Sequence, residues 1–211
     1  MVNVLITARG GSKRLPNKNK NNFCGKPLIA WTIEAALKSD YVNKVYVSTD
    51  NIDIAKISES FGAIVPRLRD KSLSEDNTTS FDTAIDFSEY FNEGDFGEML
   101  LLQPTSPLRN ETHINNLMKK VRANNLEQCV AVRDITKLIN MSKVKIEKNE
   151  KIYIPNGSMY YTRINFLKKV KTFFSSSSEI FLMGDFNSID IDNKCDWDIA
   201  EACLKSLFLK E

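Results

Sequence analysis

Glycine and positive charge are concentrated in one loop near the start of the chain, in the stretch ITARGGSKRLPNKNKNN at residues 6–22. Gly10 and Gly11 leave backbone N–H groups open to close approach by an anion. Three basic side chains can add charge-assisted hydrogen bonds to phosphate oxygens: Arg9, Lys13 and Lys18. The loop matches neither GxxxxGK[ST] nor GxGxxG. It therefore predicts a phosphate site of another kind, or a solvated basic turn.

A second polar loop, LLQPTSPLR at residues 101–109, follows an apolar run. Gln103 leaves that run with an amide that can bind a base or a sugar edge. Further donors in the loop come from Thr105, Ser106 and Arg109. Because its two prolines restrict the backbone, the loop can present these groups in a fixed arrangement. The alternative is a rigid loop with a structural role only.

Paired carboxylates occur near the end of the chain, in SIDIDNKCDWDIAE at residues 188–201. Asp190 and Asp192 are two apart on an expected strand, so both side chains should point to one face. Oxygen ligands without His or Cys suit Mg²⁺ or Mn²⁺. An exposed acidic strand end is the alternative. Asp196 and Asp198 are expected to cap and begin the last helix.

Two other polar features have mainly structural interpretations. Asn156 and Gly157 are expected to form a turn, although Asn156 could also donate to a hydroxylated substrate. His113 is the only histidine and is expected to cap a helix or lie on its surface. With no Ser or Cys placed beside a base, the sequence gives little support to a nucleophilic triad.

Short β-rich runs alternate with helical patterns along the chain. Strands are expected at 2–7, 44–50, 63–67, 128–134 and from 98 into the second loop, and helices at 27–39, 51–62, 80–91, 111–125 and the C-terminal end. This alternation predicts an α/β fold, with a mostly parallel sheet covered by helices on both faces. Such sheets bind ligands at the carboxyl ends of their strands, where the polar loops lie. A small protruding β-hairpin is expected around 142–155.

The overall composition excludes several classes of protein. The 211 residues, 42% hydrophobic, are expected to form a single domain spanning 1–211. A net charge of +2 gives no global footprint for nucleic acid. No apolar run approaches the roughly 18–20 residues that span a bilayer, so we expect no membrane segment. The four cysteines lack CxxC spacing and are expected to be free thiols in the cytoplasm.

Four stretches together resemble the motifs of the acylneuraminate cytidylyltransferases: ARGGSKRLPNKN, LLQPTSPLR, PNGSMYY and FNSIDID. The resemblance runs from residue 2 to about residue 205. It implies a Rossmann-like fold and the transfer of CMP from CTP to the anomeric hydroxyl of a nonulosonic acid, with release of pyrophosphate, for surface polysaccharide or glycan biosynthesis. It also implies Mg²⁺, with Mn²⁺ as a possible substitute, and a possible homodimer.

The resemblance further implies roles for individual residues. The nucleotide would contact Ala8, Arg9, Gly10, Ser12, Lys13, Lys18, Asn19, Arg69 and Ser80. The acceptor would contact Gln103, Thr105, Ser106, Arg109 and Asn156. Asp190 and Asp192 would hold the metal, and catalysis would rest on Arg9, Lys18, Gln103 and Asp192. The general base is not assigned.

The chain departs from the family pattern at two places. Arg14 stands where most members have Gly, and the segment before Asn156 is shorter than in members that activate sialic acid. These departures leave the acceptor open. Alternatives are 3-deoxy-manno-octulosonate, a small phosphonate, or a non-catalytic nucleotide-binding homologue.

Overall fold

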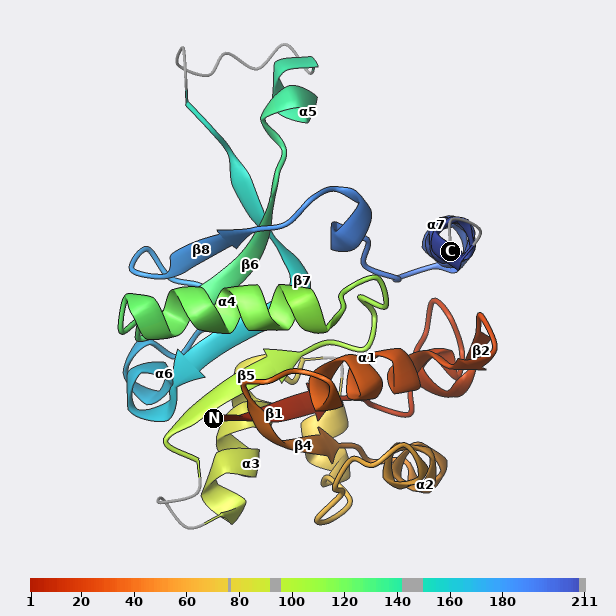
Figure 1. Cartoon of the computed structure of the whole chain (residues 1–211). Coiled ribbons are helices and arrows are strands. Elements are labelled where there is room, and N and C mark those ends of the chain that lie inside the picture. Colours follow the sequence, from red (N-terminus) through yellow and green to blue (C-terminus); the bar gives the residue numbers. More distant parts are fainter. Residues whose placement is uncertain (76, 92–95, 142–149, 209–211) are drawn as a thin grey trace.

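The computed structural model describes residues 1–75, 77–91, 96–141 and 150–208. Its main sheet has six strands in the order β4–β1–β5–β7–β6–β8 (Figure 1). The strands are β1 (Val2–Thr7), β4 (Val42–Ser48), β5 (Glu98–Leu102), β6 (Gln128–Asp134), β7 (Tyr153–Arg163) and β8 (Glu179–Leu182). Strands β2 (Asn22–Phe23) and β3 (Lys26–Pro27) form a separate antiparallel ribbon of two strands.

Most pairs in the main sheet are parallel. Strand β1 is parallel to both β4 and β5, and β6 is parallel to β8. Strand β7 runs antiparallel to β5 and β6, between which it lies. The sheet is therefore mostly parallel, as the alternation of strands and helices predicts.

Seven α-helices and three short 3₁₀ helices connect the described strands. The α-helices are α1 (Leu28–Leu37), α2 (Ile52–Ser60), α3 (Ser80–Tyr90), α4 (Glu111–Ala123), α5 (Thr136–Met141), α6 (Ile164–Val170) and α7 (Lys194–Phe208). The 3₁₀ helices are η1 (Lys18–Lys20), η2 (Lys71–Ser74) and η3 (Phe186–Ser188). His113 forms a capping box with Asn110 at the start of α4, which confirms its expected structural role.

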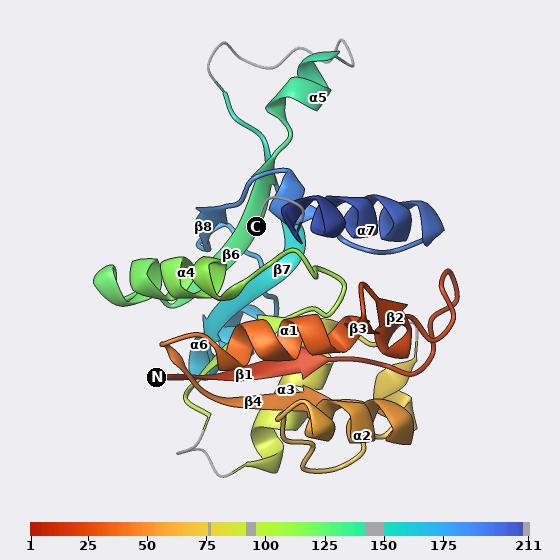
Figure 2. The same cartoon turned by 45° about the vertical axis from the view of Figure 1, so that its right-hand side comes forward.

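Side chains of the central strands alternate between two cores. Val4 and Ile6 of β1 point to a face covered by α1, α2 and α4. Leu5 points to the opposite face, which is covered by α3 and α6. Figure 2 shows α1 and α3 on opposite sides of β1. The prediction of helices on both faces is confirmed.

The expected strand at 63–67 does not form. Ile64 makes a single parallel bridge to Tyr46 of β4, and the chain then leaves the sheet edge until Leu68 bridges to Thr49. Pro66 lies between these two bridges and has no N–H to donate, which prevents a continuous ladder. This segment nevertheless brings Arg69 to the carboxyl end of β4.

Strand β7 runs through Asn156 and Gly157, where the sequence predicts a turn. Gly157 has a φ of +78°, and the pairing of β7 with β6 shifts register between Val130 and Val132. The irregular backbone is absorbed within a strand that is paired on both sides. The Asn-Gly turn prediction is therefore wrong.

The hairpin expected around 142–155 is tested only at its end, because 142–149 lie outside the described residues. There Tyr153 and Ile154 pair with Asp134 and Arg133 of β6. Helix α5, which the sequence pattern did not predict, follows β6 and stands away from the sheet in both views (Figures 1 and 2).

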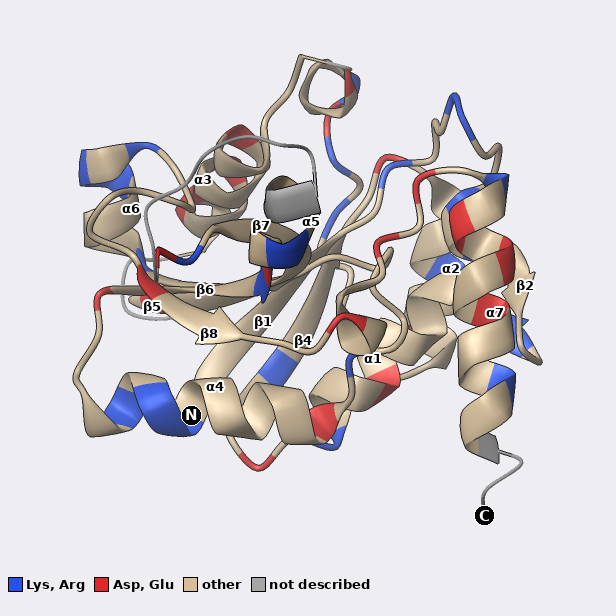
Figure 3. Cartoon of the chain, turned by 90° about the horizontal axis from the view of Figure 1, so that it is seen from above, with Lys and Arg blue, Asp and Glu red and all other residues tan. Residues whose placement is uncertain are grey.

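Helix α7 packs on the ribbon and on the start of α1. Trp197 meets Phe23 edge-to-face with ring centroids 5.0 Å apart, within a third core cluster that includes Leu28 and Leu204. The outer surface of α7 carries both signs of charge, as the ion pair between Lys194 and Asp198 illustrates (Figure 3). This packing fixes residues 188–192, which lead into the helix, contain Asp190 and Asp192, and are called the acidic segment.

The segment 188–192 is not the strand that the sequence suggests. Its main-chain link to the second loop is one hydrogen bond, from Ile191 N–H to the carbonyl of Thr105. Ile191 is fully buried in the third cluster. Asp190 and Asp192 both line the cavity described below while Ile191 between them points into the cluster, so the two carboxylates face the same side, as the spacing predicts.

The first loop lies against the start of α2. Asn51 caps α2 by accepting hydrogen bonds from Asp53 and Ile54 N–H, as expected from its position. A Cβ on Gly10 would come within 2.8 Å of the Asn51 Cβ. Gly10 N–H donates to the Asp50 carboxylate at 2.7 Å. Gly10 is thus required for close packing, while a Cβ on Gly11 would meet nothing within 4 Å.

These contacts predict different outcomes for the two glycines. Gly10→Ala should lower the free energy of unfolding by about 1–3 kcal/mol, because Asn51 must move to make room. Gly11→Ala is the matched control and should stay within about 0.5 kcal/mol of wild type. Thermal denaturation without nucleotide measures both, at about 2–4 °C per kcal/mol for a chain of this size. Equal losses would contradict the packing described here.

Candidate active site

A cavity of about 510 Å³ opens at the carboxyl ends of β1 and β5. Thr7, the last residue of β1, and Gln103, just after β5, form part of its wall. Seven residues of the first loop line it: Arg9, Gly11, Ser12, Lys13, Arg14, Lys18 and Asn19. This is the edge at which a parallel sheet is expected to bind a ligand.

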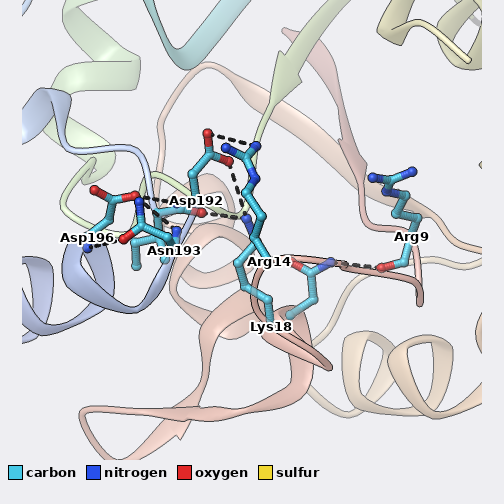
Figure 4. A network of polar contacts seen from close by, with 8 residues as sticks. Arg9, Arg14, Lys18, Asp192, Asn193 and Asp196 are labelled. Carbon is cyan, nitrogen blue, oxygen red and sulfur yellow. Dashed lines mark hydrogen bonds and ion pairs between the residues drawn. The ribbon is translucent and has the colours of Figure 1, made fainter. Parts of the chain in front are cut away.

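Lys18 links the first loop to the acidic segment. It is only 9% exposed, and its Nζ donates to the carbonyl oxygen of Ile191 and lies 3.8 Å from Asp192 Oδ1 (Figure 4). Burial lowers the pKa of Lys18, while the charges of Asp192 and Asp190 oppose that shift. The ammonium is therefore poorly hydrated and held in a fixed direction.

Asn19 stabilises the first loop through a hydrogen bond to its backbone. Its Nδ2 donates to the carbonyl of Arg9 at 3.1 Å (Figure 4). Its Oδ1 is buried and has no hydrogen-bond partner among the described residues. Asn19 therefore fixes the backbone of Arg9.

Two members of the predicted nucleotide set do not line this cavity. Ala8 is buried, and its N–H donates to the carbonyl of Ser48. Gly10 donates its N–H to the Asp50 carboxylate, so in this arrangement that N–H is engaged within the protein, and its role in binding an anion stays a prediction. Gly11, whose Cα is open, lines the cavity instead.

Arg69 reaches the cavity from the segment beside β4. Its N–H donates to the carbonyl of Thr49, and its Nε donates to Ser74 Oγ at 3.0 Å. Burial lowers its pKa; Asp50 opposes this and Arg9 adds to it. Arg69 and Arg9 thus contribute positive charge to the same cavity from different elements.

The N-terminus of α3 also faces the cavity. Thr79 caps this helix in a capping box with Asp82. Ser80, expected from the resemblance, lines the cavity, as do Thr78, Thr79 and Thr83, which sequence reasoning missed. A helix N-terminus favours anions because its first N–H groups lack partners in the helix. The capping box before an apolar run was the signal that could have found these hydroxyls.

The second loop divides into residues that face the cavity and residues beneath it. Gln103 and Thr105 line the cavity, as expected. Ser106 is fully buried and Arg109 is only 1% exposed. Both side chains point into the protein and line neither this cavity nor the second one described below, so their contact with the acceptor stays a prediction that this arrangement does not favour.

Arg109 instead supports the loop from within. It donates from one Nη to Thr32 Oγ1 at 2.7 Å and to the carbonyl of Gln103 at 3.4 Å. Its Nε and other Nη have no partner among the described residues. Burial lowers the pKa of Arg109 to about 9, so it is still charged at neutral pH. The guanidinium thereby fixes the backbone that presents Gln103.

The two aspartates differ in environment. Burial raises the pKa of Asp190, a hydrogen bond from Thr105 opposes this, and repulsion from Asp192 adds to it. Asp190 Oδ1 is buried without a hydrogen-bond partner in the described part of the chain. Asp192 is half-exposed, with Oδ2 3.1 Å from an Arg14 Nη (Figure 4). Asp190 thus has a carboxylate oxygen without a hydrogen-bond partner, while the carboxylate of Asp192 lies near the positive charges of Arg14 and Lys18.

A second cavity of about 550 Å³ adjoins the first. Both are lined by the same four side chains, which we call the junction: Arg14, Gln103, Asp190 and Asp192. A Cβ on Gly157 would lie 3.0 Å from Gln103 Oε1 and 3.1 Å from Asp190 Oδ2. The absence of a side chain at Gly157 therefore leaves room for Gln103 and Asp190 to approach this strand.

Asn156 lines the second cavity but is nearly buried. Its Nδ2 donates to Ser188 Oγ at 2.9 Å, and its Oδ1 accepts from the N–H of Ser158. These bonds join β7 to the acidic segment. Asn156 therefore lies where an acceptor-site residue is expected, with its side chain also serving the scaffold.

The geometry defines a class of protein. A basic cavity at the strand ends, a helix N-terminus and an acidic pair at a junction with a second cavity are typical of enzymes that transfer a nucleotide to a second substrate. The model of the cytidylyltransferase family matches residues 3–210. The chain belongs to that family and is a CTP-dependent cytidylyltransferase.

Curated relatives agree with this assignment. The chain is 35% identical over 221 residues to the CMP-N,N'-diacetyllegionaminic acid synthase of Legionella pneumophila, covering 96% of this chain and 95% of the relative. It is 34% identical over 216 residues to the N-acylneuraminate cytidylyltransferase of Escherichia coli, covering 93% of this chain and 50% of that relative. It is 31% identical over 189 residues to the pseudaminic acid cytidylyltransferase of Campylobacter jejuni, covering 86% of this chain and 81% of the relative.

Solved structures share the fold at lower identity. The structure of CMP:2-keto-3-deoxy-manno-octonic acid synthetase complexed with CTP matches 98% of this chain and 100% of its own, with a TM-score of 0.77 and 17% identity. The 4-diphosphocytidyl-2C-methyl-D-erythritol synthase of Anaerococcus prevotii matches 97% of this chain and 98% of its own, with a TM-score of 0.68 and 13% identity. The Rossmann-like α/β prediction is confirmed. Within the described residues, no helix has the length and apolar character that crossing a bilayer requires.

The role of Arg109 predicts the effect of removing its partner. Thr32→Val should lower the free energy of unfolding by about 1.5–3 kcal/mol, because a buried charged donor loses its closest acceptor. Ser58→Ala is a matched control: that buried hydroxyl donates within α2 to a neutral carbonyl, and its loss should cost about 0.5–1.5 kcal/mol. Urea denaturation compares the two. A smaller loss for Thr32→Val than for Ser58→Ala would show that Arg109 does not depend on Thr32.

Proposed function

We propose that the protein transfers CMP from CTP to the anomeric hydroxyl of a nonulosonic acid, a sialic-acid-like sugar, and releases pyrophosphate. The observation that carries this proposal is the meeting of two cavities at the junction. Relatives named for legionaminic, neuraminic and pseudaminic acid support the acceptor class. CTP would occupy the first cavity and the sugar acid the second.

The first cavity offers the charge that a triphosphate requires. We assign contacts with the phosphates to Arg9, Ser12, Lys13 and Lys18, with the N-terminus of α3 providing further N–H and hydroxyl donors at Ser80. Arg69 adds a second guanidinium next to Arg9. Asn19 would act by fixing the Arg9 backbone.

Asp190 and Asp192 suit a magnesium ion. The buried, unpartnered Asp190 Oδ1 is an oxygen ligand without an internal partner, and burial raises the pKa of this carboxyl, so a cation beside it would relieve both. No cluster of three metal-binding side chains exists among the described residues. Two carboxylates nevertheless fit Mg²⁺, which usually takes one or two plus substrate phosphates. Mg²⁺, or Mn²⁺ in its place, would supply positive charge near the transferring phosphate.

The proposed reaction is an in-line displacement at the junction. The anomeric oxygen bonds to the α-phosphorus as the bond to the β-phosphate breaks, and pyrophosphate leaves with the bonding electron pair. Gln103, fixed by Arg109, would orient the acceptor beside the α-phosphate. Lys18 would offset charge that builds on the transferring group. The hydroxyl proton leaves to a base, a role that we assign to one of the two carboxylates at the junction, Asp190 or Asp192.

Arg14 gives the junction a movable cation. Its side chain is 67% exposed, and such exposed ion pairs contribute only about 0–1 kcal/mol. A ligand or metal can therefore displace it from Asp192 at little cost. Since Arg14 lines both cavities, we assign it to the acceptor carboxylate or to the transferring phosphate.

Other acceptors, and a protein that binds CTP without catalysis, are distinguishable by experiment. With CTP and Mg²⁺, we expect pyrophosphate release with nonulosonic acids, and at most weak release with 3-deoxy-manno-octulosonate or small phosphonates. Release only with one of the latter would replace the proposed acceptor, and CTP binding without release from any acceptor would favour a non-catalytic homologue. We also propose a cytoplasmic location and a homodimer. Light scattering of the purified protein tests the homodimer through its molar mass, and cell fractionation tests the location.

The proposed metal site predicts a loss of function without a loss of fold. Asp190→Asn and Asp192→Asn should each reduce the rate of pyrophosphate release by about 10²–10³-fold, the scale of one lost electrostatic group in an active site. Calorimetric titration with Mn²⁺ and CTP should show weakened metal binding in both variants. Asp198→Asn is the control, because Asp198 is exposed and pairs with Lys194. Near-wild-type turnover in Asp192→Asn would place the metal elsewhere.

A further inference from the structure

One peptide group of the acidic segment is held by charged side chains on both of its sides. This peptide joins Ile191 to Asp192. Its carbonyl oxygen accepts a hydrogen bond from the Lys18 ammonium, and its N–H donates to Asp196 Oδ2 at 2.9 Å (Figure 4). In a trans peptide the C=O and N–H lie in one plane and point in opposite directions. Lys18 and Asp196 therefore fix that plane from opposite sides.

The direction of the Asp192 side chain depends on this plane. The side chain is 45% exposed, and its ion-pair partners are Arg14 and Lys18, the latter at 3.8 Å. Exposed ion pairs of this kind order a side chain only weakly. The backbone of Asp192 must therefore provide the order that a metal ligand requires, and its N–H is the group that Asp196 holds.

The contacts of Asp196 go beyond those that cap a helix. Asn193 Oδ1 accepts from Asp196 N–H at 3.1 Å, and Asp196 Oδ2 accepts from Asn193 N–H at 3.0 Å, which together form a capping box at the start of α7. The bond from Asp192 is additional, because it comes from the residue before the cap. In the box that begins α3, Asp82 Oδ2 accepts from the N–H and the hydroxyl of Thr79, which is the cap itself. The extra bond at α7 thus connects the helix to Asp192.

Charge strengthens both bonds to the Ile191–Asp192 peptide. A hydrogen bond with one ionised partner is about twice as strong as a neutral one, and here the donor on one side is an ammonium and the acceptor on the other is a carboxylate. In such a chain each bond polarises the next. Burial lowers the pKa of Lys18, and Asp196 is among the negative charges that oppose this shift. Asp196 therefore supports the ammonium as well as the peptide.

We propose that Asp196 is a positioning residue for the transfer reaction, and that it acts through the Ile191–Asp192 peptide to fix the direction in which Asp192 presents its carboxylate to a divalent cation. This inference rests on the proposed function, in which Asp192 holds that cation. A group that orients a metal ligand typically changes metal affinity or activity by about 10–100-fold when it is removed.

The test removes the acceptor and measures metal binding as well as turnover. With CTP present, calorimetric titration should show that Asp196→Ala binds Mn²⁺ about 10-fold more weakly than wild type. With a nonulosonic acid and Mg²⁺, its kcat for pyrophosphate release should fall by about 10–100-fold, while KM for CTP changes by less than about threefold. Asp196→Asn keeps a side-chain oxygen that can accept both bonds, so it should recover most of the Mn²⁺ affinity.

Two control variants separate positioning from capping and from charge. Asn110→Ala removes the side chain that caps α4, so it measures the loss of a cap alone. Asp198→Ala removes an equal charge from α7 and has no contact with Asp192. Thermal denaturation should show that Asp196→Ala and Asn110→Ala each lower the melting temperature by about 2–4 °C, the scale of one lost cap. Both controls should keep the Mn²⁺ affinity and kcat of wild type.

The outcomes distinguish this inference from the proposed function. Unchanged Mn²⁺ affinity in Asp196→Ala, with weakened binding in Asp192→Asn, would overturn the inference and leave the metal site intact. A raised KM for the sugar acid with unchanged Mn²⁺ affinity would also overturn it, because Asp196 lines the second cavity and would then be an acceptor contact. Unchanged Mn²⁺ binding in Asp190→Asn and Asp192→Asn would overturn the proposed metal site itself.

The Asn variant decides the question if Asp196→Ala does not fold. A folded Asp196→Asn protein with Mn²⁺ affinity near that of wild type would support positioning through the hydrogen bond to Asp192 N–H. Binding as weak as in Asp192→Asn would overturn it, since the accepting oxygen is still present.

Discussion

The arrangement of the site depends on one buried contact, between the ammonium of Lys18 and the acidic segment that leads into α7. Burial disfavours the charged form of this lysine, and the carbonyl of Ile191 and the two aspartates offset that effect. The contact joins residues 173 positions apart in the sequence. It therefore brings the first loop and the acidic pair together at one cavity.

The same contact explains why elements remote from the chemistry are needed for it. Ile191 can present its carbonyl to Lys18 only because its side chain is fixed in the third cluster, beneath α7. Trp197 of α7 packs on Phe23, which follows the first loop directly. The ribbon, the last helix and the first loop thus stabilise one another, and a substitution in this cluster would disturb the junction without touching a ligand.

Local sequence predicted the parts of the site whose chemistry is local. The first loop concentrates its own charge, the spacing of Asp190 and Asp192 sets their direction even without a strand, and β6 forms at 128–134 as expected. Partners distant in sequence decided the rest. Arg109 points inward because Thr32, on another element, accepts its hydrogen bond. The segment before Arg69 is held by two single bridges, one to Tyr46 of β4 and one to Thr49 just after it, which leave no periodic pattern in the sequence.

The charges at the junction and beside it nearly cancel before any ligand arrives. Arg14 and Lys18 supply two positive charges, and the two aspartates, when ionised, supply two negative ones. In the proposed binding mode, Arg9, Lys13, Arg69 and the N-terminus of α3 would neutralise the β- and γ-phosphates of CTP, whereas an α-phosphate at the junction would meet no net positive charge. This balance explains why a divalent cation would be useful at the junction. It also explains the value of Arg14, whose exposed side chain can leave Asp192 and pair with negative charge that develops on the transferring phosphate.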